Sequence, residues 1–274
     1  MCFLQLHGWM ALSPLGTSAA AGWYRIDADA YKSQALAGVM PGLGFVGDAL
    51  LTGGGTGGQM ALRALSAGGY IATPTALGSS TVFSGQLGQI INLTAADGGT
   101  HTYGAISGRG GIAQMSFSAA GSLTGTATIA APTVADLASA QIGTSSYVFS
   151  VFQDNNTLTS WTVAANGRLT AAHSLTPETG LWISAPTALT TAQVDGQTYV
   201  ILGSAGSDSL SVMAVGAGGT LTITDHLLDD RNSRFGGVAA LDVVTVGGHS
   251  YVISGGDDDG ISIHLLLPGG QLLA

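Results

Sequence analysis

The stretch that decides the fold is residues 196–221, GQTYVILGSAGSDSLSVMAVGAGGTL. It holds a short apolar run (TYVIL), a polar loop (SAGSDS), a second apolar run (LSVMAV) and a tight glycine turn (GAGG). The runs TLTITDHLL and VAALDVVTV follow, and Gly247-Gly248 then joins the second of them to SYVIS. Short apolar runs separated by glycine turns predict β-strands joined by hairpins, about four in each stretch of roughly 50 residues.

A tyrosine motif shows that this pattern repeats along the chain. In four segments a predicted turn is followed by a predicted strand that contains a tyrosine. These segments are GTHTYGAIS, TSSYVFSV, GQTYVILGS and GHSYVISGG. Their tyrosines are Tyr103, Tyr147, Tyr199 and Tyr251, at steps of 44, 52 and 52 residues. A constant step of this size is typical of repeat architectures.

A Gly-x-Leu motif keeps the same period. It begins at Gly121, Gly167, Gly219 and Gly270, at steps of 46, 52 and 51 residues. A fifth, earlier copy is DALLTGGGTGGQMALRALSAGGYI, whose Gly69-x-Ile71 lies 52 residues before Gly121. Two separate motifs with one period predict about five repeat units between residue 46 and the C-terminus, the last of them incomplete.

This pattern predicts an all-β protein and, specifically, a β-propeller of four-stranded blades. A β-solenoid is the alternative, although its rungs are usually shorter and have fewer hairpins. We expect residues 1–45 to be an N-terminal segment, part of a first or closing blade, and residues 46–274 to hold the propeller-like repeats. No unit contains an amphipathic stretch of helical length, so a parallel α/β fold is not expected.

The composition narrows the possible partners. The net charge is −9 with only 7 Lys and Arg, so nucleic-acid binding is not expected. No apolar stretch of 18 residues occurs, so no membrane span is expected. Cys2 is the one cysteine, which excludes an intrachain disulfide. The acidic balance suits a cation such as Ca²⁺, or serves solubility alone.

One polar turn recurs in every unit, at residues 53–58, 107–111, 152–156, 204–209 and 255–260. In a propeller these turns would emerge on one face, which we predict to carry any ligand site. The residues predicted to lie there are Gly55, Arg109, Asp154, Asp208 and Asp258. Asp257 and Asp259 are the candidate metal ligands, because clustered hard oxygens suit Ca²⁺. The alternative is that Asp and Gly are simply good turn residues.

Catalytic signatures are weak in this sequence. It contains no G-x-S-x-G and no H-E-x-x-H, and Glu178 is the only glutamate. The G-x-G-x-x-G match at residues 53–58 lacks the following acidic residue that a dinucleotide site requires. His264 lies inside an apolar strand, so we expect it to be a packed residue rather than a base. The sequence names no catalytic residue and no certain cofactor, and favours a non-enzymatic protein.

The run RFGGVAALDVVTVGGHSYVISGGDDDGISIHLLLPGGQLLA, with the earlier LLTGGGTGGQMALRALSAGG, resembles the N-terminal propeller-like region of bacterial haemolysin-type (RTX) calcium-binding proteins. The resemblance implies a secreted or extracellular location, a role at the cell surface and a possible origin as part of a longer protein. The G-G-x-G-x-D-x-U-x nonapeptides that bind calcium in that family are absent from this sequence.

Three functions therefore compete. The leading hypothesis is a secreted or cell-surface propeller, without enzymatic activity, that binds a carbohydrate or protein ligand. The first alternative is a propeller hydrolase, such as a lactonase, with a central metal. The second is a purely structural repeat that acts as a spacer.

Overall fold

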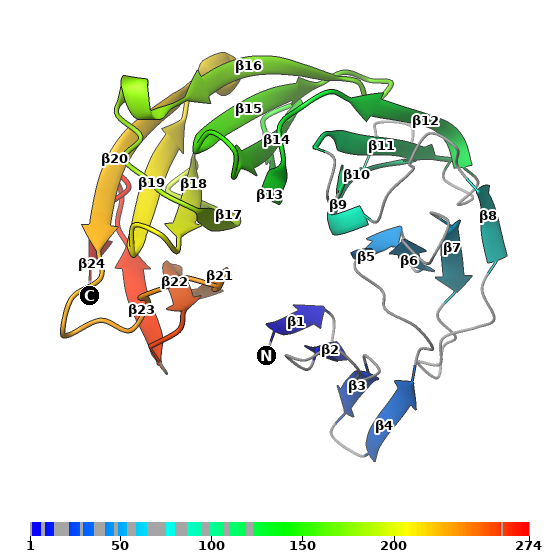
Figure 1. Cartoon of the computed structure of the whole chain (residues 1–274), viewed down its shortest axis with the longest axis horizontal. Coiled ribbons are helices and arrows are strands. Elements are labelled where there is room, and N and C mark those ends of the chain that lie inside the picture. The colour runs from blue at the N-terminus through cyan, green and yellow to red at the C-terminus, as the bar shows by residue number, and fades with distance from the viewer. Residues whose placement is uncertain are drawn as a thin grey trace.

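The computed structural model describes residues 2–6, 9–13, 22–27, 30–35, 42–46, 49–53, 59–64, 75–79, 87–94, 99–106, 110–118, 123–258 and 260–273, with side chains from Gln89 onward. The strands form six four-stranded antiparallel sheets, each with its strands in sequence order. Figure 1 shows the sheets arranged round a central axis, with the first strand of each sheet innermost and the fourth outermost. We call the sheets blades 1 to 6, in chain order.

The strand bounds are as follows. Blade 1 comprises β1 (Cys2–Leu6), β2 (Trp9–Ser13), β3 (Gly22–Asp27) and β4 (Ala30–Ala35). Blade 2 comprises β5 (Gly42–Val46), β6 (Ala49–Gly53), β7 (Gln59–Ala64) and β8 (Thr75–Ser79). Blade 3 comprises β9 (Leu87–Thr94), β10 (Thr100–Ile106), β11 (Ile112–Phe117) and β12 (Leu123–Ile129).

Blade 4 comprises β13 (Val134–Ile142), β14 (Ser145–Phe152), β15 (Thr157–Val163) and β16 (Leu169–Leu175). Blade 5 comprises β17 (Pro186–Val194), β18 (Gln197–Ser204), β19 (Ser209–Val215) and β20 (Leu221–Leu228). Blade 6 comprises β21 (Ala240–Val246), β22 (His249–Gly255), β23 (Ile261–Leu266) and β24 (Leu272–Leu273).

The prediction of an all-β propeller is confirmed, and the solenoid alternative is excluded by the separate antiparallel sheets. The five predicted units correspond to blades 2 to 6, and the strands between Cys2 and Ala35 form a sixth sheet within the N-terminal segment. One detail was wrong. The last unit is not incomplete, because Leu272–Leu273 supplies its fourth strand by pairing with β23.

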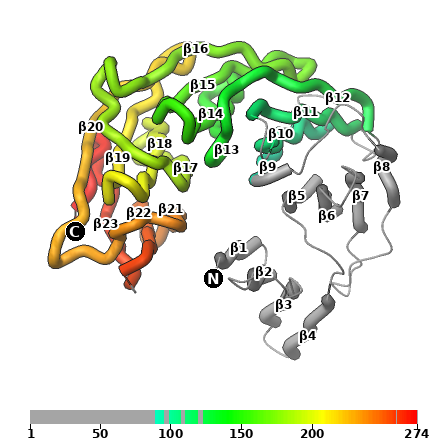
Figure 2. The backbone as a smooth tube through the Cα atoms, in the orientation of Figure 1, coloured from blue at the N-terminus to red at the C-terminus, as the bar shows by residue number. Residues whose placement is uncertain are grey.

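The core lies between the blades. Figure 2 follows the backbone of blades 3 to 6 round the ring. The middle strands β14 and β18 are buried on both faces, because each blade is covered by a neighbour on either side. This explains why their sequences, SSYVFSVF and QTYVILGS, are apolar runs rather than alternating ones. One cluster between blades 4 and 5 includes Phe149, Leu158 and Met213.

The two sequence motifs have the same period because they meet across each blade interface. The tyrosines lie on the second strand of blades 3 to 6, and the Gly-x-Leu turns precede the fourth strand. The hydroxyl of Tyr103 donates to the Gly167 carbonyl of the next blade at 2.6 Å. The Gly269 N–H, from the turn of blade 6, donates to the Tyr199 hydroxyl at 3.0 Å.

The turn glycine itself is required at this contact. Gly219 has φ +85°, and a Cβ added there would lie 3.0 Å from the Tyr147 ring. Gly270 has φ +82°, and a Cβ there would lie 2.6 Å from the ring of Tyr199. Both the left-handed conformation and the approach of the tyrosine ring therefore demand a residue without a side chain.

Helical structure is limited in the part of the chain that the structure describes to the short 3-10 turns η1 (Pro177–Thr179) and η2 (Ala217–Gly219). Neither these turns nor any other described segment forms a helix with the length and hydropathy of a membrane span.

Candidate functional site

One end of the ring, which we call the loop face, carries two kinds of connection. Because successive strands are antiparallel, the turn between the second and third strands emerges at the same end as the segment that leads to the next blade. Backbone hydrogen bonds tie the two together: Ala205 N–H donates to the Ala185 carbonyl at 3.0 Å, and Asp257 N–H donates to the Gly236 carbonyl at 2.8 Å. The described polar turns, at residues 153–156, 205–208 and 256–258, therefore share one face.

Two of the aspartates predicted to lie on the ligand-binding face accept hydrogen bonds from the backbone of segments that lead from one blade to the next. The exposed Asp154 accepts the Thr133 N–H at 2.8 Å, and this hydrogen bond lowers the pKa of its carboxyl. Asp208 accepts the Gly237 N–H at 2.7 Å, from the segment that enters blade 6. Asn156 is at the equivalent position in blade 4 and accepts the Ala185 N–H at 3.2 Å. Both Asp208 and Asn156 have positive φ, which Asp and Asn tolerate best among residues with side chains.

The candidate metal site is described only in part. Asp257 is exposed, whereas Asp258 is partly buried, and its Oδ1 has no hydrogen-bond partner among the described residues. The described ranges contain no group of three or more His, Cys, Asp or Glu residues placed to hold a metal ion. Asp259 lies outside these ranges, as do Gly55 and Arg109, so the pairing of Asp257 with Asp259 around Ca²⁺ stays a prediction. A thermal melt with calcium and with chelator tests it.

Asp136 was not singled out from the sequence. It lies two residues into β13, the innermost strand of blade 4, near the loop-face end. Its carboxylate accepts two backbone N–H groups, from Leu137 at 2.8 Å and from Leu189 of blade 5 at 2.6 Å. The residue is only 7% exposed. Burial raises the pKa of Asp136 from 3.8 to about 7, although both hydrogen bonds act in the opposite direction.

The histidines with described side chains are structural or exposed. His264 is 2% exposed and packs edge-on against Phe235 with ring centroids 5.6 Å apart, which confirms the expected packed residue. Burial lowers the pKa of His264, while Asp225 acts in the opposite direction. His101 bonds Ser116 Oγ at 3.0 Å and the Ala165 carbonyl at 3.1 Å.

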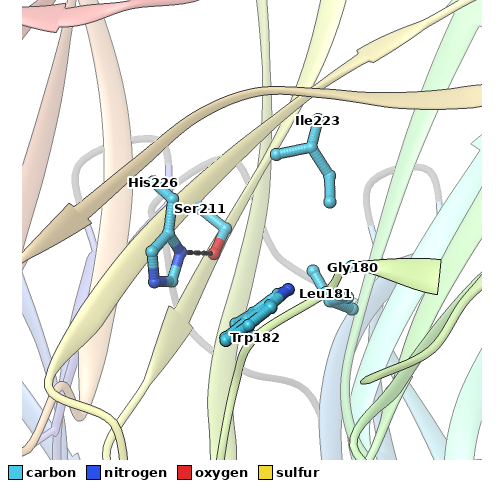
Figure 3. A pocket seen from close by; sticks show the side chains of 6 residues that line it. All are labelled: Gly180, Leu181, Trp182, Ser211, Ile223 and His226. Atoms are coloured by element: carbon cyan, nitrogen blue, oxygen red, sulfur yellow. Dashed lines mark hydrogen bonds between the residues drawn. The ribbon is translucent and has the colours of Figure 1, made fainter. Parts of the chain in front are cut away.

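A small cavity of about 100 Å³ lies beside the segment that leads from blade 4 to blade 5. Figure 3 shows the indole of Trp182 at this cavity, opposite the hydrogen-bonded pair of Ser211 and His226. Trp182 is 77% exposed, although its neighbours Leu181 and Ile183 are buried and hold the segment in place. No sequence motif marks Trp182, because its exposure is a consequence of how the two blades pack.

The Ser211–His226 pair does not make a catalytic triad. Ser211 Oγ lies 2.9 Å from His226 Nδ1. The carboxylate of the adjacent Asp225 accepts two backbone N–H groups, from His226 at 2.9 Å and from Leu272 at 2.8 Å. It therefore does not orient the His226 imidazole. Thr159 and Ser174 form the same cross-strand contact in blade 4, at 2.8 Å. The Ser–His hydrogen bond is therefore one example of a contact between the third and fourth strands that other residue pairs make in another blade.

Comparisons with known proteins find structures of the same fold but assign the chain to no family. No protein-family model matches the chain, and no curated protein matches it. Among solved structures, the periplasmic gluconolactonase of Pseudomonas aeruginosa matches with a TM-score of 0.71 and 16% identity, over 97% of this chain and 80% of the other.

A putative 6-phosphogluconolactonase from Bacteroides fragilis matches with a TM-score of 0.67 and 14% identity, over 98% of this chain and 81% of the other. The structure of BBS1N in complex with ARL6DN matches with a TM-score of 0.64 and 14% identity, over 96% of this chain and 76% of the other. At these identities the likeness establishes the architecture alone: the chain is a β-propeller.

Proposed function

We propose that this protein hydrolyses a lactone, with a sugar-derived lactone as the substrate class. The observation that carries the proposal is its likeness, over 97% and 98% of its length, to two propellers described as a gluconolactonase and a putative 6-phosphogluconolactonase. This departs from the non-enzymatic function that the sequence favours and adopts its hydrolase alternative. Because a fold hosts many functions, the residues must supply the chemical argument.

Asp136 is the group best suited to act as the base. Lactone hydrolysis requires a water molecule to add to the carbonyl carbon while a base removes its proton. The ring C–O bond then breaks, and the departing oxygen takes a proton to give a hydroxy acid. A base is most effective when its pKa lies near the working pH, and burial brings the pKa of Asp136 to about 7.

The position of Asp136 fits this role. It lies two residues into β13, the innermost strand of blade 4, close to the loop face. Each carboxylate oxygen accepts one backbone N–H, which fixes its orientation and leaves further lone pairs for a water molecule. The proposal requires no metal ion.

The experiment compares two aspartates that make the same structural contacts. Asp225, on the outermost strand β20, also accepts the N–H of the following residue and an N–H of the next blade. We expect the wild type to hydrolyse δ-gluconolactone faster than buffer does. Asp136→Asn should lower kcat by at least a hundredfold, while Asp225→Asn leaves kcat unchanged. Equal loss in both variants, or a wild-type rate equal to that of buffer, would reject the proposal.

A second candidate function is binding of a sugar ring without catalysis. The observation that favours it is the exposed indole of Trp182 beside the cavity that Ser211 and His226 line. An indole face packs against the C–H groups of a sugar, and nearby polar side chains hydrogen-bond its hydroxyls. The secreted location and the relationship to RTX proteins remain proposals that rest on the sequence resemblance.

A further inference from the structure

The free edge of β13 carries a second polar side chain beside Asp136. In an antiparallel pair, every second residue directs its N–H and C=O away from the partner strand. Leu137 is such a residue of β13: its N–H donates to Asp136 Oδ1 at 2.8 Å, and its carbonyl accepts Gln89 Nε2, from β9 of blade 3, at 3.1 Å. Because β13 is the first strand of its sheet, this edge borders the centre of the ring (Figure 1).

Asp136 and Gln89 therefore flank the backbone of one residue. Because three covalent bonds separate the N and O atoms of a residue, Asp136 Oδ1 and Gln89 Nε2 lie at most about 10 Å apart. The two side chains differ in accessibility, since Asp136 is buried and Gln89 is exposed. A sugar lactone whose carbonyl carbon lies near Asp136 can therefore extend its hydroxyls to the Gln89 carboxamide.

The carboxamide of Gln89 keeps hydrogen-bonding capacity for a ligand. A carboxamide has two N–H donors and one carbonyl oxygen, and the Leu137 carbonyl takes one of these donors. The second N–H and Oε1 can meet a sugar hydroxyl, which both donates and accepts a hydrogen bond. Because the carboxamide is uncharged, it suits a hydroxyl better than a phosphate group, which Arg and Lys bind most strongly.

The cations that could bind a phosphate group lie elsewhere in the part of the chain that the structure describes. Arg168 lies in the turn before β16, at the end of blade 4 opposite to the loop face. Arg231 and Arg234 lie in the segment that leads from blade 5 to blade 6. The pKa of Asp136 is shifted by burial and by two backbone hydrogen bonds, with no cation among the causes. The aspartates of the loop face would repel a phosphate instead.

We propose that Gln89 selects an unphosphorylated sugar lactone, whose hydroxyls it hydrogen-bonds, as the substrate that Asp136 hydrolyses. This inference rests on the lactone hydrolysis proposed above. The named neighbours leave the choice of substrate open, because one is described as a gluconolactonase and the other as a putative 6-phosphogluconolactonase. Gln89 is a specificity-determining residue, because it contacts the substrate and takes no part in the proton transfer.

The test compares Gln89→Met with Gln141→Met in the full-length protein. Methionine is unbranched like glutamine but lacks its carboxamide. Gln141 is the matched control, because it is also exposed and on an innermost strand but lies about 13 Å along β13 from Leu137. In Gln89→Met, KM for δ-gluconolactone should rise about tenfold or more while kcat changes by less than about threefold. Gln141→Met should match the wild type.

A second comparison uses the wild type alone. Its kcat/KM should be lower for 6-phosphogluconolactone than for δ-gluconolactone by about tenfold or more, because the phosphate meets aspartates and no described cation. Equal or higher kcat/KM for the phosphorylated lactone would overturn the inference.

Two further results would also overturn it. An unchanged KM in Gln89→Met would show that the substrate does not meet the carboxamide. A lower kcat with a shifted midpoint of the pH–rate profile would show that Gln89 only holds β13 and thereby positions Asp136. Each of these results leaves the lactone hydrolysis intact, whereas a wild-type rate equal to that of buffer rejects the hydrolysis and the selectivity together. Gln89→Leu provides the same comparison should Gln89→Met not fold.

Discussion

At the scale of single residues, the two most informative side chains were not predicted from the sequence. Asp136 is one of 16 acidic residues, and only its burial between two blades distinguishes it. Trp182 belongs to no motif, and its exposure depends on the path of the connection between blades. Of the acids that the sequence singled out, Asp154 and Asp208 lie on the loop face and accept backbone N–H groups there.

The raised pKa of Asp136 predicts how stability depends on pH. The folded-state pKa of about 7 exceeds the ordinary 3.8, so the folded state binds the proton more tightly than the unfolded state does. The contribution is therefore fully present below pH 4 and is lost as the pH rises through 7. The free energy of unfolding of the wild type relative to Asp136→Asn should fall by up to about 4 kcal/mol between pH 4 and pH 8. Urea unfolding of both proteins measures it, and a constant difference across this range would contradict the account.

Substitutions of two adjacent residues at the cavity, Leu181 and Trp182, should have different effects on the free energy of unfolding. Trp182→Ala should change the free energy of unfolding by no more than about 0.5 kcal/mol, because the indole is 77% exposed. Leu181→Ala should cost about 2–5 kcal/mol, because Leu181 is 1% exposed and belongs to the core between blades 4 and 5. Chemical denaturation measures both values. If Trp182→Ala destabilised the protein as much as Leu181→Ala, the indole would be a packing residue and its proposed role in sugar binding would be lost.

At the scale of elements, the sequence predicts a blade where that blade carries both the tyrosine motif and the Gly-x-Leu motif. Tyrosine on the second strand and glycine before the fourth mark blades 3 to 6, because these residues touch across each interface. Blade 1 lacks both: its second strand is WMALS, and Ala28-Asp29 separates its third and fourth strands. The sequence therefore predicts residues 1–45 only as an N-terminal segment, part of a first or closing blade, without its individual strands.

The contact between turn and tyrosine can be tested within one turn. Gly218 and Gly219 are both left-handed, but a Cβ at Gly218 meets nothing within 4 Å, whereas one at Gly219 meets the Tyr147 ring. Gly218→Ala should cost about 1 kcal/mol, from backbone strain alone. Gly219→Ala should cost about 1–3 kcal/mol more, from overpacking. In a Tyr147→Ala background most of the extra cost should disappear, leaving the tight contact of 3.3 Å with the Ala172 Cβ. An extra cost that is unchanged there would show that the tyrosine is not its cause.

At the scale of the whole molecule, the repetition of one blade unit explains the architecture. Each interface between blades 3 and 6 buries the tyrosine-bearing face of one blade against the next blade. The antiparallel strand order brings the connections between blades to the loop face, and Asp136 lies near that face because it is two residues into β13. The fold thus accounts for the position of the proposed base, and the burial between blades accounts for its pKa.

The pH dependence of lactone hydrolysis tests the proposed function most directly. The rate of δ-gluconolactone hydrolysis, after subtraction of the buffer rate, is measured from pH 5 to pH 9 for the wild type, Asp136→Asn and Asp225→Asn. The account predicts that kcat/KM of the wild type rises about tenfold per pH unit up to the pKa of Asp136, about 7, and is constant above it. Asp225→Asn should show the same profile and Asp136→Asn should show none. A wild-type rate equal to that of buffer at every pH, or an unchanged profile in Asp136→Asn, would contradict the account.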